Sequence, residues 1–206
     1  MAKRAKAGGD GFWGWLGENT ERVKRGLKRG TGRVAEEGGE AFDEAFPGLV
    51  WEVSPVERGP WLFCVSANGD GKLFPRVERA VREAPEVAGW TVQAFRPRGE
   101  ADAEISLNDL TLGGDDVWCE VAPARRGIDL VLHVRGATAE NVDLITQASL
   151  ILLDNAIGEY DSVKRIAGLD VAMLEGRPRK SESFFPLKDL PGFLDGTRRA
   201  RRGGGA

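Results

Sequence analysis

Three carboxylates fall within eight residues, at Asp154, Glu159 and Asp161. Their oxygen atoms are the ligands that Mg²⁺ and Ca²⁺ prefer, and a pair of them could serve as acid and base if one were buried. The spacing lacks the D-x-[DN]-x-[DN]-G signature of an EF-hand loop. The run also fits a helix end with solvated acids and a glycine cap at Gly158, and we favour this simpler interpretation.

A second polar segment, Ala67-Asn68-Gly69-Asp70-Gly71-Lys72, lies between a predicted strand and a predicted helix. Backbone N–H groups at such a junction can bind an anion. The run lacks the G-x-x-x-x-G-K-[ST] spacing of a P-loop, so a plain turn before a helix is favoured.

The single histidine, His133, excludes a His-rich zinc site, and the two cysteines, Cys64 and Cys119, are too few for a disulfide scaffold. Both cysteines fall inside strand patterns and are expected to pack as small apolar residues. No nucleophile elbow, H-E-x-x-H or C-x-x-C motif is present. We therefore predict no catalytic residue, no metal site and no cofactor.

Tryptophan is enriched, with six residues against one tyrosine. Four of them fall on predicted strands, and Trp is common at binding surfaces, although core filling is the simpler explanation. The candidate ligand-binding residues are Trp51, Trp61, Trp90, Trp118, Asn68, His133, Asn155, Glu159 and Tyr160.

The net charge of -3 hides a strong asymmetry along the chain. Residues 1–33 hold nine Lys/Arg and three Asp/Glu, and residues 176–206 hold eight and three. The remainder holds twelve basic and twenty-six acidic residues. Basic tails could bind RNA or DNA, but solvated tails beside an acidic body are favoured.

Hydrophobic patterning places these residues on a small set of elements. Residues 12–27 and 36–46 are expected to form helices, although glycines weaken the first. Runs at 49–53, 61–66, 90–95, 117–121, 128–134 and 163–174 predict strands. Residues 74–84 and 139–157 predict helices, and 97–114 is expected to be a long connection.

The order strand-strand-helix-strand occurs twice. We predict an α+β fold in which the two units form one mainly antiparallel sheet with the helices on one face, preceded by an N-terminal helix. The expected segments are a disordered basic tail at 1–11, a helical segment at 12–48, an α+β domain at 49–175 and a basic C-terminal tail at 176–206.

Three blocks resemble the recurring blocks of an uncharacterised bacterial protein family, in which an aromatic N-terminal helix precedes an α+β domain. The blocks are Phe12-Trp13-Gly14-Trp15, Val65-Ser66-Ala67-Asn68-Gly69-Asp70 with Phe74-Pro75, and residues 152–161. The resemblance covers residues 12–175, implies a bacterial cytoplasmic setting and carries no activity.

The resulting hypothesis is a non-catalytic cytoplasmic protein that binds a protein or small-molecule partner on an open, Trp-bearing sheet face. One alternative is a metal-assisted hydrolase that uses Asp154, Glu159 and Asp161, with His133 as a base. A weak nucleic-acid binder acting through the basic tails is the other. No apolar run is long enough for a transmembrane segment, and the start does not read as a secretory signal.

Overall fold

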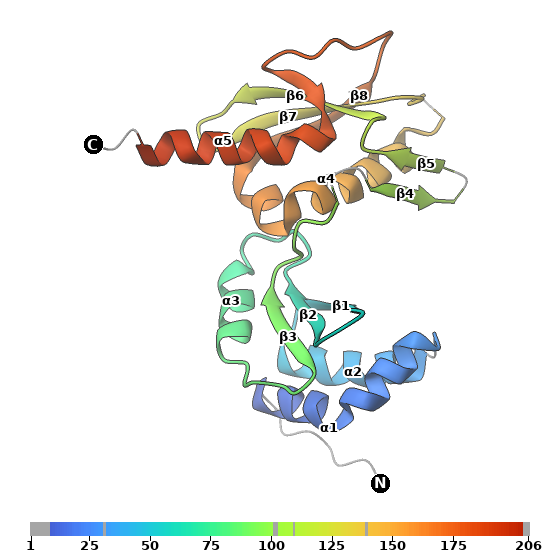
Figure 1. Cartoon of the computed structure of the whole chain (residues 1–206), viewed down its shortest axis with the longest axis vertical. Coiled ribbons are helices and arrows are strands. Elements are labelled where there is room, and N and C mark those ends of the chain that lie inside the picture. The colour runs from blue at the N-terminus through green and yellow to red at the C-terminus, as the bar shows by residue number, and fades with distance from the viewer. Residues whose placement is uncertain (1–8, 31, 101–102, 109, 139, 204–206) are drawn as a thin grey trace. The chain divides into compact units, whose positions relative to one another are not determined.

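The computed structural model describes residues 9–30, 32–100, 103–108, 110–138 and 140–203. The chain divides into two compact units, Met1–Arg96 (unit 1) and Pro97–Ala206 (unit 2), each with its own helices and strands (Figure 1). The predicted α+β class, the mostly antiparallel pairing and the N-terminal helix are confirmed. The strands of the described residues, however, form three separate sheets instead of one.

Unit 1 begins with two helices, α1 (Gly9–Lys28) and α2 (Gly32–Ala45). Residues 9–11 of the predicted disordered tail are therefore helical, while residues 1–8 lie outside the described residues. The glycines of α1 do not break the helix, because burial of one apolar stripe offsets their low helix propensity. The buried apolar side chains of this stripe are those of Phe12, Trp13, Leu16 and Val23.

The sheet of unit 1 has the order β1-β2-β3, with bounds Val50–Ser54, Trp61–Ser66 and Trp90–Ala94. β1 and β2 are antiparallel, whereas β2 and β3 are parallel. A parallel pair needs a crossover connection, and α3 (Phe74–Arg82) supplies it. This is the predicted strand-strand-helix-strand order.

Helices cover both faces of this sheet. On one face, the ring of Phe63 lies 5.6 Å from Phe12 of α1 and 6.2 Å from Phe42 of α2. On the other face, Phe74 of α3 lies 4.3 Å from Phe95, just beyond β3. The prediction that helices occupy one face is thus wrong for unit 1, because the aromatic stripes of α1 and α2 need a sheet surface for their own burial.

Unit 2 repeats the same topology. β6 (Val117–Pro123) is antiparallel to β7 (Ile128–Val134), which is parallel to β8 (Ile166–Met173), and α4 (Val142–Arg165) crosses between β7 and β8. The segment 97–114, expected to be a connection, contains a hairpin of β4 (Glu104–Leu107) and β5 (Leu110–Gly113).

The C-terminal segment predicted as a basic tail is structured. β9 (Phe184–Pro186) pairs with β6 and gives the sheet order β8-β7-β6-β9. A short 3-10 helix η1 (Leu187–Asp189) and α5 (Leu190–Gly203) follow. Leu187, Leu190 and Leu194 are fully buried, so their helical spacing adds to the core although the segment as a whole is basic. Residues 204–206 lie outside the described residues.

One face of the unit 2 sheet carries the core. Alternate residues such as Cys119, Leu130 and Leu132 are buried with Ile145 and Leu152 of α4 in one hydrophobic cluster. The first part of α4 ends at Gly158, as predicted, because φ 75° and ψ 155° there are not helical, and a second helical segment continues to Arg165. No helix among the described residues is long and apolar enough to cross a membrane.

Candidate functional site

Three of the four candidate tryptophans lie on the sheet of unit 1, where Trp61 and Trp90 are buried and Trp51 is half-buried. Trp61 and Trp90 are 4% and 6% exposed, and Trp51 stacks on Phe63 at 5.4 Å. The indole N–H of Trp90 donates to Thr20 Oγ1 on α1 at 2.9 Å. The proposed binding face is therefore covered by helices in unit 1, and the buried Trp61 and Trp90 fill the core there.

Asn68 shapes a turn in unit 1. Its φ is 51°, its N–H donates to Ser66 Oγ at 2.9 Å, and its Oδ1 accepts from Arg96 Nη2 at 2.9 Å. Asn and Asp side chains stabilise such left-handed turn positions. The contacts of Asn68 support the interpretation as a turn before a helix.

The carboxylates near Gly158 do not form the metal-binding cluster considered above. Asp161 accepts from Arg98 Nη2 at 2.5 Å, while Glu159 is 1% exposed. Within the described ranges, no group of three or more His, Cys, Asp or Glu residues could hold a metal ion. Asn155 donates to the Glu100 carbonyl at 2.8 Å and so fixes the start of unit 2, whereas Tyr160 is exposed.

His133 and Trp118 do share a sheet face, on the side of unit 2 opposite its core. His133 Nε2 and Glu120 Oε2 are 2.8 Å apart, and Phe184 lies 5.3 Å from both the His133 and Trp118 rings. These side chains form a half-buried aromatic cluster on neighbouring strands. Both Trp118 and His133 were candidates from the sequence, but Phe184 was missed because it lay in the supposed tail.

A pocket of about 700 Å³ lies elsewhere in unit 2, at the end of the sheet where β6 turns into β7. It is lined by the end of β6, the turn, the end of α4, the segment before β9, and α5. Its lining residues are Val121, Ala122, Pro123, Arg125, Arg126, Gly127, Ile128, Lys164, Arg165, Glu182, Ser183, Phe193, Leu194 and Thr197.

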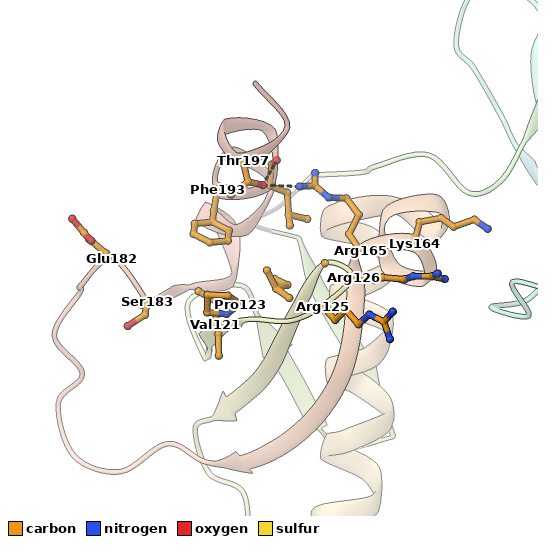
Figure 2. Close-up of a pocket in the computed structure, with 14 residues that line it drawn as sticks. Val121, Pro123, Arg125, Arg126, Lys164, Arg165, Glu182, Ser183, Phe193 and Thr197 are labelled. Carbon is orange, nitrogen blue, oxygen red and sulfur yellow. Dashed lines mark hydrogen bonds between the residues drawn. The ribbon is translucent and has the colours of Figure 1, made fainter. Parts of the chain in front are cut away.

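The positive charges of this pocket lie along one side. Figure 2 shows Arg125, Arg126 and Lys164 along one side and Glu182 on the other. Residues 97–175 contain six Lys/Arg residues, and four of them line the pocket. The other two, Arg98 and Arg135, are ion-paired with carboxylates, whereas Arg125 and Arg126 form no ion pair with any described residue.

Two contacts hold the basic side in place. Arg165 Nη2 donates to Thr197 Oγ1 at 2.6 Å, which joins the end of α4 to α5 (Figure 2). Gly127, with φ +95°, brings the turn against α4, because a Cβ there would lie 2.0 Å from the Arg165 carbonyl oxygen. The turn that carries Arg125 and Arg126 thus requires glycine at this position.

No protein-family model, no curated protein and no solved structure matches this chain. The likeness of its sequence blocks to a bacterial family accordingly stays an expectation, and the site is interpreted from its own geometry.

The sequence reasoning missed this pocket. A signal was present: Arg125-Arg126-Gly127 is a pair of cations and a glycine between two predicted strands, inside a strongly acidic segment. The apolar lining from Phe193 and Leu194 could not be found, because it lies about 70 residues away in the segment taken as a tail.

Proposed function

We propose that unit 2 is a binding module for an amphiphilic organic anion, a molecule with an apolar body and a phosphate or carboxylate end. The observation that supports this function is a row of cations along one side of a largely apolar pocket, with Glu182 on the opposite side. Guanidinium groups pair with carboxylate and phosphate through parallel N–H donors, and their geometry suits both.

The apolar lining favours a small amphiphile over a polymer. Val121, Pro123, Ile128, Phe193 and Leu194 offer surface that an alkyl chain or ring can cover. At about 0.8 kcal/mol per buried CH₂, each pair of added methylene groups would strengthen binding about tenfold. A pocket of about 700 Å³ has the size of small-molecule sites in proteins.

The test is a calorimetric titration of the full chain with decyl phosphate, decanoate and the uncharged decanol. Both anions are expected to bind, and decanol is expected to bind more weakly. Comparing decyl phosphate with decanoate shows which end group the pocket prefers. Hexyl phosphate should bind less tightly than decyl phosphate, because its shorter chain buries less apolar surface.

Variants distinguish binding in the pocket from a general attraction of the anion to basic residues. The double change Arg125→Gln with Arg126→Gln should weaken decyl phosphate binding about tenfold and leave decanol binding unchanged. The matched control is Arg76→Gln with Arg79→Gln, two exposed arginines of α3 in unit 1. Equal weakening by both pairs, or no binding of any anion, would overturn the proposal.

Nucleic acid binding is the competing outcome. A labelled oligonucleotide that binds with a steep salt dependence, and that decyl phosphate fails to displace, would favour the alternative function through the basic segments.

A further inference from the structure

Strand β8 has an unoccupied edge. It is the outer strand of the order β8-β7-β6-β9, it is eight residues long, and no strand of the described residues pairs with its other side. Its sequence, IAGLDVAM, contains a single charge and no proline or lysine. Proteins blunt such edges with charges, prolines or bulges, and a long apolar edge is a template for another strand. The pairing of β8 with β7 has one register shift, at the start of β8 between Ile128 and Asp129, and residues 168–173 beyond it pair regularly.

The hydrogen bonds show which groups point outward. Leu174 N–H donates to the Val134 carbonyl of β7, so the even-numbered positions of β8 face β7. The N–H and C=O groups of Leu169, Val171 and Met173 therefore point away from the sheet. The N–H of Val171 is met by the Asp170 carboxylate beside it, at 2.8 Å.

Exposed apolar side chains lie on β8 and on α4, the helix that packs against it. Among the described residues, seven large apolar side chains are exposed, and six of them are on β8 or α4. Leu169 and Met173 are 42% and 53% exposed. Helix α4 packs against β8, and its Leu150 and Ile151 are each 40% exposed. Outward main-chain groups and the exposed side chains of Leu169 and Met173 thus lie on the same strand.

We propose that the β8 edge binds a second copy of this chain, by antiparallel pairing of β8 with β8 around a two-fold axis at Val171. A strand that meets its own copy must be self-complementary, since each residue contacts another of the same strand. In this register Leu169 lies opposite Met173 of the second copy, and Val171 lies opposite Val171 of the second copy. The outward N–H and C=O groups of these three residues are those that the pairing uses.

The register also determines which residue of the second copy lies opposite Asp170. Asp170 lies opposite Ala172 of the second copy, so the two carboxylates do not face each other across the pair. Asp170 must release the Val171 N–H before the strands join, which makes this carboxylate a competitor of dimer formation. Replacing Asp170 should consequently strengthen dimer association. If only apolar contacts held the two strands together, the replacement would not change the association.

The experiment is sedimentation velocity on the full chain from about 1 to 500 µM, where mass action shifts a weak dimer. The wild-type chain should rise toward twice 22.3 kDa with concentration. Met173→Lys, which sets a charge against Leu169, should weaken the dimer at least tenfold. Asp170→Ala should tighten it several-fold, and Val56→Lys, on an exposed residue of unit 1, should change nothing.

A second variant tests the main-chain pairing. Val171→Pro removes an outward N–H that the ladder with β7 does not use, and edge positions of this kind tolerate proline. Loss of the dimer with an unchanged circular dichroism spectrum would support the register. A wild-type chain that stays at 22.3 kDa throughout, or a dimer unaffected by Met173→Lys, would overturn the proposal.

Discussion

The Arg98 guanidinium donates to the Asp161 carboxylate at 2.5 Å, from Nη2 to Oδ2. The same group donates to Asp195 of α5 and, through Nε, to the Ile157 carbonyl at the kink of α4. Hydrogen bonding to Asp195 raises the pKa of Arg98, with Asp161 adding to the effect against the cost of burial. One cation therefore joins the start of unit 2, the second half of α4 and α5.

We expect Arg98→Ala to destabilise unit 2 by about 2 kcal/mol, since it leaves the nearly buried Asp161 carboxylate without its cation. Hydrogen exchange measured by mass spectrometry should show faster exchange in α4 beyond Gly158 and in α5. Arg135→Ala removes an exposed ion pair with Asp116 at 3.6 Å and should cost less than about 1 kcal/mol. Similar protection in both variants would contradict the role given to Arg98.

The turn at Gly127 provides a second prediction. Gly127→Ala combines a positive φ with a Cβ placed 2.0 Å from a backbone oxygen, so the turn or the end of α4 must move. We expect a loss of about 3 kcal/mol or more in the free energy of unfolding, measured by urea denaturation. Anion binding in the pocket should fall as well, because Arg125 and Arg126 lose their position.

Gly136→Ala is the matched control for this change. Gly136 also has a positive φ, of +75°, but a Cβ there meets nothing within 4 Å. It should cost only the conformational strain, about 1 kcal/mol. If the two variants were equally stable, the close approach of Gly127 to Arg165 would have no energetic consequence.

Stability at alkaline pH should depend on Cys119. Burial raises the pKa of this thiol above its ordinary value of 9.0. Above that pH the unfolded chain releases the proton while the native state keeps it, so this thiol makes stability fall with rising pH, by up to about 1.4 kcal/mol per unit. Below that pH it contributes no pH dependence.

The check is the free energy of unfolding at pH 8 and pH 10 for the wild-type chain and for Cys119→Val. The difference between these two pH values should be smaller in the variant, which lacks the Cys119 thiol. An unchanged difference would show that the thiol ionises equally well in both states. Native Cys119 should also resist iodoacetamide at pH 8, because the thiolate is the reactive form.

The sequence predicted the elements where local pattern decides them. The alternation of Ile128, Leu130 and Leu132 predicted β7, and all three are buried. The strand-strand-helix-strand order predicted both repeats, although not that each would form its own sheet. Which strands share a sheet depends on contacts between distant segments, and a periodic pattern does not contain them.

The errors arose where charge or glycine masked an apolar face. Leu187, Leu190 and Leu194 lie in a segment with eight Lys/Arg residues, so composition suggested a tail. For the candidate site, the same error removed Phe184, Phe193 and Leu194 from consideration. The placement of the four candidate tryptophans on strands was predicted correctly, but whether helices cover such a face follows from tertiary packing alone.

The cover that α1 provides in unit 1 can be tested without removing a tryptophan. Leu16 is 1% exposed on the stripe of α1 that is buried in unit 1, and Leu16→Asp would bury an unpaired carboxylate there. We expect α1 to detach and Trp61 and Trp90 to become accessible. Tryptophan emission should shift to the red and acrylamide quenching should increase, whereas Arg25→Asp, on the exposed side of the same helix, should leave both unchanged. If a folded Leu16→Asp variant kept the wild-type emission and quenching, α1 would not be the element that shields these two indoles, and their face would again be open to a ligand.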